Sequence, residues 1–323
     1  MTGGVFRDLA VRLSVTEQCQ LRCRYCLPQG GCMPPCSGPA LDAEAIRLLL
    51  HALHDEFGIR KLRFTGGEPL LRRDIVSMIR SAADLGIPDI ALTTNAQLLA
   101  GKAIALRQAG LHRVNISLDS LRPGVFAGIT HGGRLEATLR GIRAAMDADL
   151  RPIKLNMVVM RGINDGEVSD ILRFGLETGC HVRFLELMPI GVARTEFHER
   201  FVSSDEVRER LGDCCLWQPM IDAQDSSSRN WKVSDASGRA TVCGFISPAS
   251  HPFCGGCRRV RITAGGELIG CLARGRRLPL AAALSAAARG DHSLLARSIG
   301  RAFAMKQGAM FQTGADCMAN VGG

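Results

Sequence analysis

The chain has 323 residues, of which 46% are hydrophobic and 22% charged, a balance typical of a globular protein rather than a disordered one. No apolar stretch reaches the roughly 20 residues of a membrane span. No signal-peptide core follows the N-terminus, so we expect a cytoplasmic protein without a membrane partner. The net charge of +9 favours an anionic partner, either nucleic acid or a phosphorylated small molecule. Only 5% of the residues are aromatic, whereas proteins that bind single-stranded nucleic acid usually stack bases on aromatic side chains.

Alternating strand and helix patterns fill the first two-thirds of the chain. Strands are expected at 9–15, 61–64, 89–92, 113–117, 153–159 and 182–187, and helices at 42–57, 72–85, 97–109, 135–147 and 167–177. Such an α/β alternation predicts a parallel sheet, wound as an incomplete (β/α)6 TIM-like barrel. In such folds the chemistry gathers at the carboxyl ends of the strands.

The pattern changes after residue 217. Residues 218–229 are polar and end in a run of serines, as in a linker. Short strands are expected beyond it, at 231–234, 240–245, 258–263 and 267–269. We therefore expect two domains, a barrel at 1–217 and a small C-terminal domain at 218–323.

Three closely spaced cysteines, Cys19, Cys23 and Cys26, follow the first predicted strand. Thiols so close strain a disulfide between them, but they can wrap around one soft metal centre. Zinc would want a fourth ligand, which is not adjacent, whereas an iron–sulfur cube held by three cysteines leaves one iron open. Buried or zinc-binding cysteines are the plainer alternative. The 13 cysteines of the chain favour metal ligation in a reducing compartment over a disulfide scaffold.

Glycines and small polar residues end the next strands. Gly66 and Gly67 let a ligand approach the backbone, while Glu68 or free N–H groups can hold an ammonium or a carboxylate. A tight turn is the alternative. Thr93 and Ser117 end the third and fourth strands, where hydroxyl groups serve either as ligand contacts or as turn and cap residues.

Basic residues within the predicted strands indicate a polyanion in the barrel. Lysine and arginine are rarely buried without partners. The set comprises Arg12, Lys61, Arg63, Lys154 and Arg183, and the spacing of Lys61 and Arg63 places them on one strand face. These side chains either converge on the barrel interior or alternate outward at its edges.

A second cysteine set, Cys254, Cys257 and Cys271, lies in the C-terminal region. Glycines between the first two allow a tight knuckle, and a hairpin can return Cys271 beside it. A zinc knuckle is the alternative. Arg259 and Arg261 share a strand face next to this set, where guanidinium groups can clamp phosphate or a purine edge.

The first cysteine set, with the aromatic Tyr25 before its last cysteine, resembles the signature of the radical S-adenosylmethionine (SAM) enzymes. The resemblance implies the incomplete barrel. It also implies a [4Fe-4S] cluster on Cys19, Cys23 and Cys26 whose open iron binds SAM. The reduced cluster of that family cleaves SAM to a 5′-deoxyadenosyl radical.

With the Gly-Gly-Glu-Pro loop, the second cysteine set and the terminal Gly322-Gly323, nearly the whole chain resembles the GTP 3′,8-cyclase (MoaA) family of molybdenum cofactor biosynthesis. The resemblance implies a second [4Fe-4S] cluster on Cys254, Cys257 and Cys271, whose open iron holds the guanine of GTP. In that family the radical takes the ribose 3′ hydrogen and the 3′ carbon attacks guanine C8. The product is (8S)-3′,8-cyclo-7,8-dihydroguanosine 5′-triphosphate.

Positions carried over from the resemblance fall into three groups. SAM-binding positions are Tyr25, Gly66, Gly67, Glu68, Ser117 and Met188. GTP-binding positions are Arg12, Arg63, Thr93, Lys154, Arg259 and Arg261. Catalytic positions are Arg259, Arg261, Gly322 and Gly323. The two glycines are included because the Gly-Gly tail is expected to reach the active site. As residues alone, the two glycines read either as a threading tail or as a frayed end.

The resemblance also implies partners: GTP as substrate, an electron donor, and cyclic pyranopterin monophosphate synthase to consume the product, with no nucleic acid. A homodimer is one option for the assembly.

One departure from the family pattern is Ala96, where the family usually has glycine. Two other hypotheses stay open, a radical SAM enzyme with an auxiliary cluster that modifies a peptide, and a zinc-stabilised nucleic-acid-binding protein. Seven further cysteines have no assigned role, namely Cys32, Cys36, Cys180, Cys214, Cys215, Cys243 and Cys317.

Overall fold

A computed structural model of the chain describes residues 7–27, 39–213, 215–222, 226–253, 257–272 and 275–306. Its strands form one twelve-stranded sheet in the order β12-β11-β10-β1-β2-β3-β4-β5-β6-β9-β8-β7. The strands are β1 (Leu9–Ser14), β2 (Ile59–Thr65), β3 (Ile90–Thr94), β4 (Arg113–Ser117), β5 (Lys154–Val159), β6 (His181–Glu186), β7 (Leu216–Pro219), β8 (Arg229–Ser234), β9 (Ala240–Ile246), β10 (Arg259–Ile262), β11 (Glu267–Ile269) and β12 (Arg277–Pro279).

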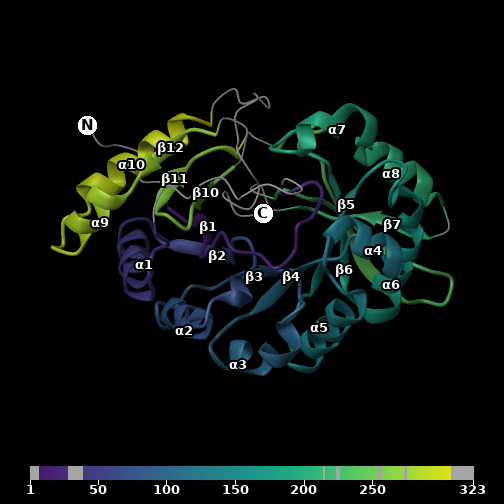
Figure 1. Cartoon of the computed structure of the whole chain (residues 1–323), viewed down its shortest axis with the longest axis horizontal. Coiled ribbons are helices and arrows are strands. Elements are labelled where there is room, and N and C mark those ends of the chain that lie inside the picture. Colours follow the sequence, from purple (N-terminus) through teal and green to yellow (C-terminus); the bar gives the residue numbers. More distant parts are fainter. Residues whose placement is uncertain are drawn as a thin grey trace.

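The six strands β1 to β6 are parallel and adjacent in chain order. Figure 1 shows them curving into an open barrel with helices on the outside. The helices are α1 (Ala43–Phe57), α2 (Ile75–Asp84), α3 (Ala103–Gln108), α4 (Pro123–Thr130), α5 (Leu135–Asp147), α6 (Val168–Thr178), α7 (Ala193–Arg200), α8 (Ser204–Leu211), α9 (Ala281–Ala287) and α10 (Ser293–Ala304). The predicted parallel (β/α)6 barrel is confirmed.

The strands from β7 onward extend both edges of the barrel sheet. β9 pairs in parallel with β6, and β8 and β7 continue antiparallel beyond it. On the opposite edge β10 pairs in parallel with β1, followed by the antiparallel β11 and β12. The strand β7 already occupies 216–219, so the polar segment expected from 218 begins two residues later. A division into two domains at 217/218 stays a prediction.

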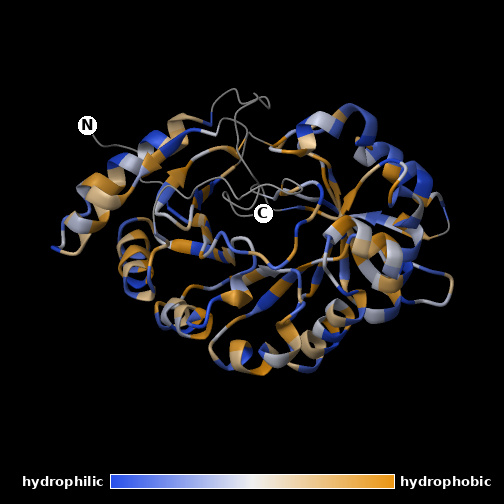
Figure 2. Cartoon of the chain, viewed as in Figure 1, coloured by the Kyte–Doolittle hydropathy of each residue, from blue (hydrophilic) through white to orange (hydrophobic). Residues whose placement is uncertain are grey.

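Helix α1 illustrates how local sequence sets an element and its buried face. The Asp42 side chain accepts a hydrogen bond from Ala45 N at 2.8 Å, which caps the first turn. Gly58 ends the helix with φ of +66°, a conformation that glycine adopts without strain. Leu49 and Leu50 are fully buried against the sheet. Figure 2 shows the same division across the barrel, with apolar strands inside and polar helix faces outside.

Several helices differ from the sequence-based expectation. The helix expected at 97–109 is split into a 3-10 turn (Leu99–Gly101) and the short α3. Helix α4 was not predicted because two glycines interrupt its eight residues, and α7 because Ala193 is its one buried residue. In the described part of the chain, none of the helices has the length and apolarity that crossing a bilayer requires.

Candidate active site

A cavity of about 560 Å³ opens at the carboxyl ends of the barrel strands. Most of the residues singled out from the sequence line it: Arg12, Cys19, Cys23, Tyr25, Cys26, Arg63, Gly66, Gly67, Thr93, Ser117, Met188, Cys257, Arg259, Arg261 and Cys271. Glu68 and Lys154 do not line it. Cys254, Gly322 and Gly323 lie outside the described residues. Both cysteine sets therefore contribute to the wall of one cavity.

The first cysteine set lies on a loop that is bonded to the barrel at several points. Arg22 N donates to Thr130 O and Arg24 N to Ile129 O, each at 3.0 Å. The amides of Cys26 and Leu27 both donate to Cys23 O, which forms a tight turn around the second cysteine. These backbone contacts hold the three thiols toward the cavity.

The glycines of the Gly-Gly-Glu-Pro loop let this cysteine loop pack directly on the end of β2. A Cβ on Gly67 would lie 2.3 Å from Gln18 O, and one on Gly66 would lie 2.3 Å from Thr16 O. In the gap, Gly67 N donates to Thr16 O and Glu68 N to Gln18 O, each at 2.8 Å. The amides expected to meet a ligand are thus used to fix the loop, while both glycines still line the cavity.

Glu68 lies below the cavity wall and is fully buried. Its carboxylate accepts hydrogen bonds from Thr94 Oγ1 and Asn95 N, each at 2.8 Å, and from Leu70 N at 3.0 Å. Burial raises the pKa of this carboxyl to about 7, although the three hydrogen bonds oppose the rise. Glu68 connects the ends of β2 and β3, and a direct contact with SAM stays a prediction.

Asp119 is a residue of the site that the sequence reasoning did not select. Its Oδ2 accepts a hydrogen bond from Tyr25 Oη at 2.7 Å, and its Oδ1 accepts one from Val158 N at 2.8 Å. Burial raises the pKa of Asp119 to about 6. The sequence did offer a signal, since Asp119 lies two residues beyond the end of β4, where functional side chains are expected. Its pairing with the cysteine loop, however, depends on the fold.

Arginines from three neighbouring strands form one layer in the cavity. In the register of the sheet, Arg12 on β1 lies opposite Arg63 on β2 and Arg261 on β10. Burial, followed by the charges of Arg261 and Arg63, lowers the pKa of Arg12, and burial lowers that of Arg261 to about 10. Among the described residues no carboxylate forms an ion pair with Arg12 or Arg63. Close positive charges without such partners are expected where an anion binds.

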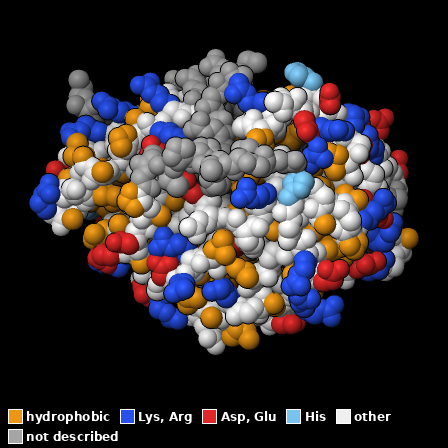
Figure 3. All heavy atoms as spheres, viewed as in Figure 1, with side chains coloured by type: hydrophobic (Ala, Val, Ile, Leu, Met, Phe, Trp, Pro, Cys, Tyr) orange, Lys and Arg blue, Asp and Glu red, His pale blue; other side chains and the backbone are white. Residues whose placement is uncertain are grey.

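Two further basic residues lie deeper in the barrel. Arg183 on β6 lines the cavity, and burial lowers its pKa to about 10. Lys154 is the first residue of β5, and burial together with Arg183 lowers its pKa to about 6. On the face drawn in Figure 3, the exposed Lys and Arg side chains are interspersed with acidic ones. Arg183 therefore joins Arg12, Arg63 and Arg261 among the basic residues that line the cavity.

Around the second cysteine set, Cys257 and Cys271 line the cavity beside Arg259. Arg259 Nε donates to Cys257 Sγ at 3.4 Å, and the guanidinium lies 4.8 Å from the ring centre of Phe253. Lys306, just beyond α10, donates to the same sulfur at 3.7 Å. Burial alone would raise the pKa of Cys257, but Arg259 and Lys306 outweigh it and lower the pKa to about 7. Lys306 was not singled out from the sequence.

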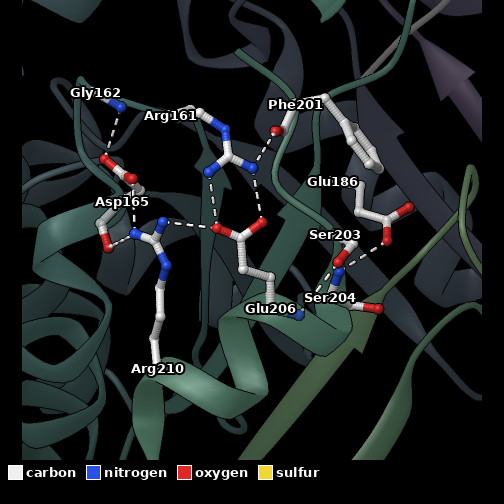
Figure 4. A network of polar contacts seen from close by, with 9 residues as sticks. All are labelled: Arg161, Gly162, Asp165, Glu186, Phe201, Ser203, Ser204, Glu206 and Arg210. Atoms are coloured by element: carbon white, nitrogen blue, oxygen red, sulfur yellow. Dashed lines mark hydrogen bonds and ion pairs between the residues drawn. The ribbon is translucent and has the colours of Figure 1, made fainter. Parts of the chain in front are cut away.

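The wall that leads to the second set is held by Glu186 at the end of β6. Its carboxylate accepts from the amides of Ser204, Ala249 and Ser250 at 2.9 to 3.0 Å, and from Ser250 Oγ. Figure 4 shows how α8 is fixed on its other side, where Arg161 and Arg210 both point at Glu206. Glu186 therefore links β6, α8 and the segment before the cysteine knuckle.

Ala96, where a glycine was expected, adopts φ of +62° and is fully buried. Its amide donates to Thr94 Oγ1 at 2.9 Å, so the turn is held despite the side chain. The departure changes the strain of this turn and leaves the cavity lining as it is, because Ala96 does not line the cavity.

The arrangement of the thiols indicates which metal centre they suit. Within the described residues, no three His, Cys, Asp or Glu side chains converge on a position for one metal ion. Zinc would require sulfur atoms at about 2.3 Å from a single point. A cube, in contrast, offers each cysteine its own iron, and three thiols on a loop facing a cavity suit that arrangement. The first set therefore fits an iron–sulfur cluster with one open iron.

Comparison with known proteins supports the same class. Residues 13–175 match the radical SAM superfamily, and residues 180–311 match the family described as Molybdenum Cofactor Synthesis C. A structure of SuiB from Streptococcus suis bound to S-adenosylmethionine shares the fold, with a TM-score of 0.57 and 15% identity, covering 85% of this chain and 62% of SuiB. Barrel, cysteine loop and family match together define a radical SAM enzyme, a class whose members carry a [4Fe-4S] cluster and SAM.

The particular family follows from the closer relatives. The GTP 3′,8-cyclase of Listeria monocytogenes is 43% identical over 265 residues, which span 81% of this chain and 78% of that protein. The GTP 3′,8-cyclase of Heliobacterium modesticaldum is 41% identical over 304 residues, which span 92% and 90%. The chain belongs to the GTP 3′,8-cyclase family.

Proposed function

We propose that this protein converts GTP to (8S)-3′,8-cyclo-7,8-dihydroguanosine 5′-triphosphate in molybdenum cofactor biosynthesis. The observation that carries the proposal is the layer of Arg12, Arg63 and Arg261 in a cavity that both cysteine sets line. A triphosphate supplies negative charge for Arg12 and Arg63, which form no ion pair with a carboxylate among the described residues. A peptide substrate without acidic groups would not supply that charge to Arg12 and Arg63.

Each part of the cavity wall has a task in this reaction. Cys19, Cys23 and Cys26 hold a [4Fe-4S] cluster, which when bound supplies the electron that cleaves SAM. Tyr25, Gly66, Gly67, Ser117 and Met188 hold SAM, and Glu68 positions that side of the wall through Asn95. Thr93 and the arginines of β1, β2 and β10 hold GTP, with the guanidinium groups on its phosphates. Lys154, which lies behind the wall, completes the GTP-binding set. Substrate and SAM then meet in one cavity away from bulk water.

We further propose that Cys254, Cys257 and Cys271 hold a second [4Fe-4S] cluster, with Arg259 and Arg261 beside it as catalytic residues. The thiols of Cys257 and Cys271 share the cavity with these arginines, which supports that assignment. Gly322 and Gly323 complete the site as the end of a tail that reaches it. The C-terminal region, 218–323, then acts as the substrate-binding part of the protein.

The proposed function also requires partners. A low-potential electron donor reduces the first cluster, and cyclic pyranopterin monophosphate synthase takes the product. We place the reaction in the cytoplasm, with a homodimer as one form of the assembly. Neither nucleic acid nor a membrane has a part in it.

The test is substrate-dependent SAM cleavage. Anaerobically reconstituted protein with SAM and dithionite should form 5′-deoxyadenosine at least tenfold faster with GTP than with ATP, together with a GTP-derived cyclised product. The variant Arg12→Met should lose most of that stimulation, because the phosphates lose one of their cations. Stimulation by a peptide and indifference to GTP would contradict the proposal and favour a peptide-modifying enzyme.

A further inference from the structure

The two described cysteines of the second set, Cys257 and Cys271, lie among cationic groups. The Cys257 sulfur accepts hydrogen bonds from Arg259 Nε at 3.4 Å and from Lys306 Nζ at 3.7 Å. Lys306 Nζ also donates to the backbone oxygens of Cys257 and Arg259, which keeps the ammonium in this place. Arg261 lies close enough to act electrostatically on both Cys257 and Cys271. A group bound to these thiols would be surrounded by positive charge.

The first cysteine set has different surroundings. The Cys19 sulfur accepts from two neutral donors, Leu21 N at 3.4 Å and Asn95 Nδ2 at 3.8 Å. Two buried carboxylates act on these thiols, Glu68 on Cys19 and Asp119 on Cys23. The loop also carries two arginines, of which Arg22 is exposed to solvent and Arg24 is paired with Glu196 at 2.8 Å.

Charge near a cluster sets how easily it is reduced. A cluster that accepts one electron becomes more negative, so cationic donors on its thiolates favour the reduced form, while nearby carboxylates oppose it. Hydrogen bonds to the ligands act in the same direction as the cations. Buried charges are screened less than exposed ones, so the groups lining the cavity have the larger effect.

We propose that the protein holds its two clusters at ordered reduction potentials, the second being the easier to reduce, and that Lys306 is a positioning residue that maintains this order. The inference rests on the proposed function only in needing the second cluster, and it does not depend on GTP being the substrate. Lys306 acts through Cys257, by donating to its sulfur and by tying the knuckle to the end of α10. The first cluster is then the stronger reductant, as SAM cleavage demands.

The order is measured on two single-cluster proteins. Replacing Cys254, Cys257 and Cys271 by alanine leaves the first set, and replacing Cys19, Cys23 and Cys26 leaves the second. Each is reconstituted anaerobically and titrated by electron paramagnetic resonance without SAM or GTP. The second-set protein should be reduced at the more positive potential. Equal or reversed midpoints would overturn the proposal.

The role of Lys306 is measured in the second-set protein. Lys306→Met keeps the length of the side chain but removes its charge and its donors. The reduced-to-oxidised ratio at a fixed potential should fall about tenfold, equivalent to about 59 mV for one electron. Lys306→Arg should recover most of the loss. Lys232→Met, on an exposed position of β8, is the matched control and should change nothing. An unshifted midpoint in Lys306→Met would refute the assigned role.

A complementary variant tests the first set. Asp119→Asn keeps the shape and removes the negative charge, so the first cluster should become easier to reduce while the second stays unchanged. No change in the first midpoint would contradict the electrostatic argument.

Iron content distinguishes failure of this inference from failure of the proposed function. A second-set protein that binds no iron rejects the second cluster and the inference together. Ordered midpoints without a GTP product reject the substrate alone.

Discussion

At the scale of single residues, Glu68 has the clearest consequence for stability. It is fully buried, and its pKa of about 7 is higher than the ordinary value of 4.5. Between these two values the folded state holds a proton that the unfolded state has released. The free energy of unfolding therefore falls as the pH rises through this window, by about 1.4 kcal/mol per pH unit for one proton.

We expect this dependence to vanish in Glu68→Gln, which cannot titrate. Urea unfolding of the metal-free protein at pH 4.5 and pH 7.5 isolates the effect, because other groups cancel between the two proteins. On going to the higher pH the original chain should lose on the order of 3 kcal/mol more than the variant. Parallel losses in the two proteins would show that Glu68 ionises normally.

Tyr25 and Asp119 give a second prediction at this scale. Tyr25→Phe removes the hydroxyl that donates to Asp119 Oδ2 and leaves a buried acceptor without that bond. A cost of about 1 to 3 kcal/mol in unfolding free energy is expected. Arg24 lies on the same loop as Tyr25 and forms a half-exposed ion pair with Glu196 of α7. Arg24→Gln, which breaks this pair, should cost less than about 1 kcal/mol. If the two variants are equally stable in urea, Tyr25 does not anchor the loop.

At the scale of elements, the contact between the cysteine loop and β2 depends on the absence of a side chain at residue 67. Gly67→Ala places a Cβ against the backbone at Gln18, which cannot rotate away. The reconstituted variant should bind less than half the iron of the first cluster, while its far-ultraviolet circular dichroism stays that of a folded barrel. Gly128→Ala in α4 meets no atom within 4 Å and should keep full iron content. Normal iron binding by Gly67→Ala would refute the close-packing account.

Two carboxylates around α8 are predicted to differ in importance. Glu186 is buried and accepts from three amides, so Glu186→Ala should destabilise by about 3 kcal/mol or more. Glu206 joins Arg161 and Arg210 at the surface, as drawn in Figure 4, and Glu206→Ala should cost about 1 kcal/mol. Chemical unfolding of both variants measures the loss of unfolding free energy. A larger loss in Glu206→Ala than in Glu186→Ala would contradict the predicted order.

At the scale of the whole molecule, the barrel was predictable because the residues within each strand–helix unit determine its secondary structure. Apolar runs such as β5 and amphipathic helices such as α1 show their period within a dozen residues. The pairing of β9 with β6 and of β10 with β1 was not predictable, because residues far apart in the sequence meet there. That pairing is what brings Arg261 into register with Arg12.

The same distinction applies to the site. The spacing of the cysteines and the glycines at strand ends can be recognised in the sequence, and the described cysteines of both sets line one cavity with these glycines. Asp119, Glu186 and Lys306 contact Tyr25, Ala249 and Cys257, which lie 49 to 94 positions away in the chain, so only the fold shows these contacts. Aspartate, glutamate and lysine are common on polar surfaces and in turns, so the residue types alone do not mark these positions as parts of a site.

The proposed cyclase reaction is tested most directly by following the ribose 3′ hydrogen of GTP. GTP carrying deuterium at the ribose 3′ position is turned over anaerobically with unlabelled SAM, and the 5′-deoxyadenosine is analysed by mass spectrometry. Abstraction of the ribose 3′ hydrogen should place one deuterium in the 5′-deoxyadenosine, and GTP labelled only at C8 or at the ribose 5′ position should give none. Unlabelled 5′-deoxyadenosine from 3′-deuterated GTP, formed alongside product, would contradict it.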